Sequence, residues 1–191
     1  MKYALLTALL SLTLASLSSY AASTAPSVAV VSEPCGASEM ALQCRSLGKG
    51  KADCLHPVLT IKTDGAQAQK LGNPSGIEEQ SPIGLACVTS EADHNQYFYV
   101  LFGSLPSGCD VCEWHHLYDT RGKLLTTSNP ATIDIPDAPP TQSIAPNNRS
   151  FDDLSKKLNL GHYQANSIVC VGPHIDGKGN PLCTAEVSHG R

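Results

Sequence analysis

The residues whose types and spacing could do chemistry form one short cluster, Cys109-Asp-Val-Cys112 followed by His115 and His116. A Cys-x-x-Cys pair supplies half of a common zinc ligand set, and either histidine could add a third ligand. The same pair could carry out thiol redox chemistry, or a cysteine and a histidine could act as nucleophile and base. Cys109, Cys112, His115 and His116 are therefore the candidate metal-binding or redox residues.

Three features of this cluster favour a structural role for its cysteines. No second Cys-x-x-Cys pair follows, and the histidine spacing is too short for a zinc finger. Trp114 and strand-forming residues follow Cys112, whereas a reactive thiol of this motif sits at a helix N-terminus. We expect both cysteines to form disulfides, and we expect no cofactor and no catalytic residue. A thiol-redox or zinc-dependent enzyme is the alternative.

The chain has eight cysteines, an even number that is typical of a disulfide-bonded exported protein. They are Cys35, Cys44, Cys54, Cys87, Cys109, Cys112, Cys170 and Cys183. Eight cysteines allow many connectivities, so the sequence alone leaves most of the pairings open.

The N-terminus has the pattern of a secretory signal peptide, which we assign to residues 1–21. A basic start precedes an apolar run at residues 4–17, and small residues end at Ala21. The run is too short to span a bilayer. We therefore expect an exported protein that is periplasmic or secreted. The signal peptide is more typical of bacteria than of eukaryotes. Residues 22–34 are expected to be a flexible leader, and residues 35–191 a single disulfide-rich domain.

The charge balance bears on the classes of partner. The chain has 13 basic and 17 acidic side chains. Removal of Lys2 with the signal peptide leaves a net charge of about −5. A mildly acidic protein is a poor match for nucleic acid or for an anionic membrane surface. We expect no nucleic-acid partner and no membrane insertion after signal cleavage.

The residues between Gly84 and Thr127 have the strongest strand pattern and predict a four-stranded meander. Phe98, Val100 and Phe102 line one face of its second strand, and apolar residues also line the other face. This strand should be covered on both sides. Residues 123–127 are expected to form the fourth strand.

Two segments have helical spacing. Ser38 to Leu47 has apolar residues three and four apart before Gly48, and Ser150 can cap a second helix that Gly161 closes. The expected fold class is α+β. It comprises an antiparallel β-sheet, made of the meander plus a C-terminal hairpin, with two or three short helices, stapled by disulfides.

The C-terminal hairpin gives one specific disulfide prediction. Two short apolar segments flank the turn at Asp176-Gly177, and Cys170 and Cys183 are equidistant from this turn. They would face each other on adjacent strands at a position where side chains are closest. We therefore predict a Cys170–Cys183 disulfide.

The function expected from these patterns is the binding of a macromolecular partner, without catalysis. No nucleophile elbow and no zinc-protease motif occurs. A stapled scaffold with long polar loops suits a periplasmic inhibitor or immunity-type protein, and a secreted effector that acts on a host is a further alternative. The candidate partner-binding residues lie in the 91–95 turn and the 128–149 connection. They are Glu91, Asp93, His94, Asp134 and Asp137.

Overall fold

The computed structural model describes residues 26–48, 51–105, 113–128, 146–169 and 183–186. The elements in chain order are β1 (Ser27–Cys35), β2 (Ser38–Gly48), β3 (Lys51–Thr63), β4 (Gln69–Lys70), β5 (Ser81–Thr89), β6 (Gln96–Gly103), β7 (Trp114–Asp119), α1 (Arg149–Leu158), β8 (Asn166–Val169) and β9 (Thr184–Glu186).

The strands form two antiparallel sheets, which we call sheet A and sheet B. Sheet A has the order β1-β2-β3-β4, and sheet B has the order β7-β6-β5-β8-β9. Within the described residues α1 is the single α-helix. The expected α+β class with two or three helices was therefore wrong, because the chain is mostly antiparallel β-structure in two sheets.

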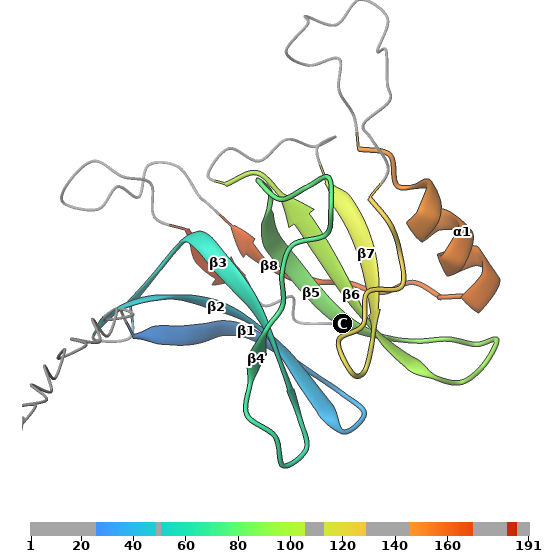
Figure 1. Cartoon of the computed structure of the whole chain (residues 1–191), viewed down its shortest axis with the longest axis horizontal. Coiled ribbons are helices and arrows are strands. Elements are labelled where there is room, and N and C mark those ends of the chain that lie inside the picture. The colour runs from blue at the N-terminus through green and yellow to red at the C-terminus, as the bar shows by residue number, and fades with distance from the viewer. Residues whose placement is uncertain (1–25, 49–50, 106–112, 129–145, 170–182, 187–191) are drawn as a thin grey trace, which may run out of the picture.

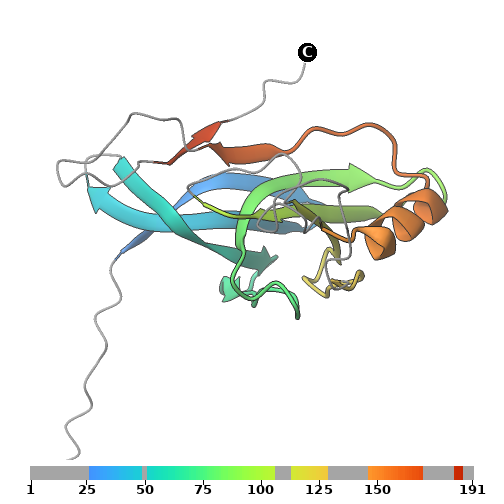
Figure 2. The same ribbon diagram turned by 90° about the horizontal axis from the view of Figure 1, so that it is seen from above.

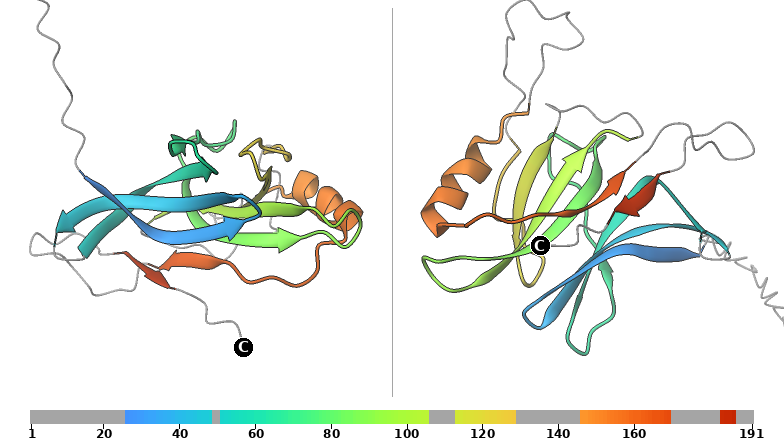
Figure 3. Two further views of the ribbon diagram at one scale, coloured as in Figure 1. Left: turned by 90° about the horizontal axis from the view of Figure 1, so that it is seen from below. Right: turned by 180° about the vertical axis from the view of Figure 1, so that it is seen from behind.

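The main core lies between the two sheets. Its buried side chains come from both sheets and include Met40, Leu42, Leu59, Leu85, Phe98 and Phe102. A second cluster lies on the other face of sheet B, where Phe151 and Leu158 of α1 pack near Tyr99 and Leu117. Figure 1 shows α1 beside β7, with the strands of sheet A on the side of the molecule opposite α1. The views from above (Figure 2) and from below and behind (Figure 3) show the same arrangement.

The segment expected to be the first helix is β2, a strand. Its residues are good helix formers, yet Met40, Leu42 and Cys44 alternate toward the core. β2 pairs with β1 on one side and β3 on the other. Ladder hydrogen bonds on both edges and burial in the core override the local helical preference.

The expected flexible leader was also wrong for residues 27–34, which belong to β1. The register between β1 and β2 shifts between Ala29 and Val31. An extra residue at such a bulge changes the phase of the side chains. For this reason the apolar residues of β1 have no regular alternation in the sequence.

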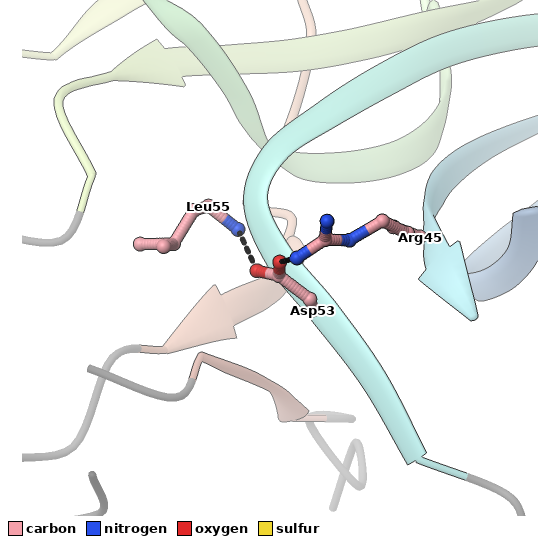
Figure 4. A network of polar contacts seen from close by, with 3 residues as sticks. All are labelled: Arg45, Asp53 and Leu55. Carbon is pink, nitrogen blue, oxygen red and sulfur yellow. Dashed lines mark hydrogen bonds and ion pairs between the residues drawn. The ribbon is translucent and has the colours of Figure 1, made fainter. Parts of the chain in front are cut away.

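A second irregularity lies in β3 and is fixed by Asp53. The register between β2 and β3 shifts next to Cys44, and a disulfide joins Cys44 to Cys54 across these strands. One carboxylate oxygen of Asp53 accepts the N–H of Leu55 at 3.1 Å, and the other pairs with Arg45 (Figure 4). The carboxylate thus satisfies a backbone donor at the point where the ladder is interrupted.

The meander of sheet B is confirmed for its first three strands. Phe98, Val100 and Phe102 face the main core, and Tyr99 faces the second cluster, as the two apolar faces predicted. The expected fourth strand at residues 123–127 was wrong. Among the described residues, the only strand pairing of the return segment is an isolated bridge between Leu124 and Tyr118.

The predicted helix near residue 150 is confirmed, but its ends differ from those expected. α1 begins after Asn148 and ends at Asn159, whose φ of 48° is left-handed. The Ser150 hydroxyl does not cap the helix; it accepts the N–H of Thr127 at 3.0 Å. Asn148 bonds the edge of β7, where its Oδ1 accepts the N–H of His115 and its Nδ2 donates to the carbonyl of Glu113. These bonds fix the helix against β7.

The register of the C-terminal hairpin is confirmed. β8 pairs with β9 through residues equidistant from the expected turn, such as Ile168 with Ala185 and Val169 with Thr184. Cys183 is buried and disulfide-bonded. Cys170 lies outside the described residues, so the Cys170–Cys183 disulfide stays a prediction.

One disulfide links the two sheets. Cys35, the last residue of β1, is bonded to Cys87 of β5, 52 residues away in sequence. All cysteines among the described residues are disulfide-bonded. The cysteine sulfur atoms of this part of the chain therefore serve as cross-links.

Candidate functional site

The histidines of the proposed metal cluster do not converge. His115 and His116 are consecutive in β7, so their side chains point to opposite faces of sheet B. His115 contacts Tyr99 and Phe151 beside α1, whereas His116 contacts Phe102 on the main-core side. No group of three or more candidate metal ligands occurs within the described ranges. Cys109 and Cys112 lie outside these ranges.

His116 is bonded through both ring nitrogens. Its Nδ1 lies 2.8 Å from the Thr126 hydroxyl, and its Nε2 lies 3.0 Å from the Ser128 hydroxyl. The side chain is 1% exposed. With both nitrogens engaged by hydroxyl groups, His116 has no free lone pair for a metal ion.

The direction of these bonds depends on the tautomer of His116. Leu117 N–H donates to the Thr126 oxygen at 3.1 Å and occupies one of its two lone pairs, and we assign the Thr126 proton to the bond with His116 Nδ1. The neutral imidazole then has its proton on Nε2 and donates it to Ser128. Burial, and secondarily His115, lower the pKa of His116 to about 4. A general base must accept the serine proton, so this arrangement does not activate Ser128 as a nucleophile.

His115 is part of an aromatic group next to α1. The Tyr99 hydroxyl lies 3.1 Å from His115 Nδ1, and burial raises the pKa of Tyr99. The phenol therefore stays protonated. Burial lowers the pKa of His115, an effect that the Asp152 carboxylate partly offsets. At any pH above this lowered pKa, the His115 side chain is neutral and packs against Tyr99 and Phe151.

The turn between β5 and β6 is an exposed loop that the sequence singled out, and hydrogen bonds hold it at its base. Its base is Ser90, which is fully buried. The Ser90 hydroxyl donates to the carbonyl of Leu158 at 2.7 Å and accepts the N–H groups of Ala92 and Asp93 at 3.2 Å each. Figure 1 shows the tip of the β5–β6 hairpin next to the end of α1.

Backbone groups add to this attachment. Ala92 N–H donates to the Leu158 carbonyl, and Glu91 N–H donates to the Asn159 carbonyl. Carbonyl groups at a helix C-terminus have no partner within the helix. The turn thus supplies the missing donors, and α1 and the turn fix each other.

The two carboxylates of the turn are also held in place. The Tyr97 hydroxyl donates to Asp93 Oδ2 at 2.6 Å, and Asn95 N–H donates to Oδ1 at 3.0 Å. These bonds lower the pKa of Asp93 well below its usual range. The Asn159 amide donates to the carboxylate of Glu91. Both groups are exposed, so the turn presents oriented negative charge to the solvent.

His94 directly follows Asp93 in the turn and is exposed. Its φ of 59° is left-handed. Such backbone conformations are costly for residues with a Cβ and persist where the surroundings fix them. Here the His94 N–H bonds the Ser90 carbonyl at 3.0 Å, which closes the turn.

The structure thus brings together three of the five predicted partner-binding residues, Glu91, Asp93 and His94. Asp134 and Asp137 lie outside the described residues. The residues that anchor the turn, Ser90 and Asn159, were not predicted from the sequence. A serine before a polar turn is a known backbone-bonding signal, but its partner on α1 is 68 residues away and gives no local signal.

Comparisons with protein-family models, with curated proteins and with solved structures find no significant match to the chain. The disulfides are consistent with an oxidising, exported environment. Within the described ranges, no helix combines the length and apolar character that a membrane span requires.

Proposed function

We propose that this chain is an exported, non-catalytic protein that binds a protein partner through the β5–β6 turn, residues 90–96. The observation that carries the proposal is that this turn is exposed at its tip and fixed at its base by α1 and Ser90. A loop already held in one conformation loses little entropy when it binds, which increases affinity. The concrete version is a periplasmic inhibitor or immunity-type protein that occludes the cleft of a hydrolase.

The chemistry of the turn indicates a basic partner surface. Asp93 and Glu91 are exposed and their carboxylates are oriented by Tyr97 and Asn159. Such carboxylates suit lysine or arginine side chains lining a cleft. Asp134 and Asp137 of the 128–149 connection lie outside the described residues and stay predicted partner-binding residues.

Site-specific photo-crosslinking tests this proposal. A photoreactive residue in place of His94, introduced in the cells that export the protein, is expected to give one adduct of defined mass. The same residue in place of Gln67, which is exposed in the β3–β4 turn, serves as the matched control and should give none. The protein identified in the adduct also distinguishes a partner in the producing cell from a host protein, as the effector alternative requires.

A charge reversal adds a second readout to this experiment. Asp93→Lys is expected to reduce the His94 adduct at least about tenfold, equivalent to ~1.4 kcal/mol of binding free energy. Asp64→Lys makes the same change in another exposed turn and should have no effect. Equal adducts at positions 94 and 67, or an adduct that is insensitive to Asp93→Lys, would contradict the proposal.

A further inference from the structure

Residues 126–128, which follow the bridge to β7, are attached to sheet B in an unusual way. Leu125 N–H still donates to the Leu117 carbonyl at 2.8 Å, as in a strand. Beyond Leu125, the described contacts of this segment run through hydroxyl groups. Thr126 and Ser128 bond His116, and Thr127 N–H bonds the Ser150 hydroxyl. A single imidazole therefore bonds two of these three residues, and Thr126 also accepts the N–H of Leu117.

We propose that His116 is an acid-sensitive latch, which holds residues 126–128 against β7 while its ring is neutral and releases them when the ring takes up a proton. The neutral ring fits its two partners because it accepts from Thr126 and donates to Ser128. An added proton occupies Nδ1 and removes the acceptor of the Thr126 hydroxyl. Thr126 is 2% exposed, and its oxygen already accepts the Leu117 N–H.

If His116 is protonated while residues 126–128 stay against β7, two groups are left without a favourable partner. The Thr126 hydroxyl would lose its acceptor in a buried place, and a positive charge would be buried beside it. Movement of residues 126–128 away from β7 admits water and relieves both costs. The strands beneath the latch are held by ladder hydrogen bonds and stay in place.

Among the residues that the structure describes, the groups around His116 offer no compensation for the added charge. Phe102 packs against the ring from β6, and Thr126 and Ser128 are uncharged. His115 lies on the other face of β7 and disfavours the proton. Glu78 belongs to the 71–80 loop, where its carboxylate accepts the N–H of Gly76.

Amide hydrogen exchange on the whole protein tests the latch. The opening constant of the Thr127 amide, corrected for intrinsic exchange, is expected to rise about 40-fold between pH 6 and pH 4. The Ala92 amide, which bonds the Leu158 carbonyl on α1, should not respond in this range. His116→Gln should remove the pH dependence at Thr127, whereas His162→Gln, at an exposed histidine, should keep it.

A nitrogen-15 NMR titration of the wild-type histidines keeps the test valid if His116→Gln does not fold. His116 is expected to be neutral with its proton on Nε2 at pH 6.5, and to change state together with the opening at Thr127. An Nδ1–H tautomer, an unchanged opening constant at pH 4, or an equal rise in folded His116→Gln would overturn the proposal. None of these outcomes depends on whether the β5–β6 turn binds a partner.

Discussion

Replacing Cys35 and Cys87 together by alanine is expected to lower the free energy of unfolding by about 4 kcal/mol, measured by urea denaturation. This disulfide joins β1 of sheet A to β5 of sheet B across 52 residues. Closing so long a loop removes much conformational entropy from the unfolded chain. The bond also ties together two sheets that otherwise adhere through the core between them.

The second described disulfide provides the comparison. Cys44 and Cys54 join adjacent strands of sheet A across only 10 residues. Their joint replacement by alanine is expected to cost about 3 kcal/mol, because the closed loop is shorter. If this pair costs more than the Cys35–Cys87 pair, the inter-sheet bond is not the main covalent support of the fold.

The stability of the protein is expected to fall as the pH falls from 6.5 to 4, by roughly 2 to 3 kcal/mol from His116 alone. The pKa of His116 is lowered from 6.5 to about 4 in the folded chain. Between these values the unfolded chain binds a proton that the folded chain does not, so acid favours unfolding. Below about pH 4 the loss of stability due to His116 is complete. Opening of residues 126–128 would limit the loss, because it lets the ring take up its proton in a folded state.

Urea denaturation at several pH values measures this effect. His116→Gln should flatten the profile between pH 6.5 and pH 4, and His162→Gln should leave it unchanged. The lowered pKa of Asp93 acts in the same direction, but its contribution is lost only below the pKa of an unfolded aspartate, about 4. A profile as steep in His116→Gln as in the wild type would assign the acid sensitivity to other groups.

Local patterns were sufficient for the parts of the fold where one signal dominates. The two apolar faces of β6, the helix α1 and the register of the β8–β9 hairpin follow from side-chain alternation, helical spacing and a turn position. The β2 segment was misassigned because its helix-forming residues are held as a strand by both neighbours. The bulge in β1 concealed a strand by breaking its alternation.

The candidate site was predictable only in part. The polar turn after β5 could be recognised from Glu91, Asp93 and His94, but nothing local indicates that Ser90 bonds the end of α1. Likewise, the pairing of Cys35 with Cys87 depends on how two sheets pack, which spacing in the sequence does not reveal. Long-range contacts of this kind set the rigidity on which the proposed binding role rests.

The most direct test of whether the cysteines are cross-links and not reagents is mass spectrometry of the unreduced protein, alkylated after denaturation. Zinc analysis of the native protein accompanies this measurement. We predict that none of the eight cysteines is alkylated and that no zinc is bound. Alkylation of Cys109 and Cys112, or one zinc ion per chain, would contradict this and would favour a thiol-redox or zinc-dependent enzyme.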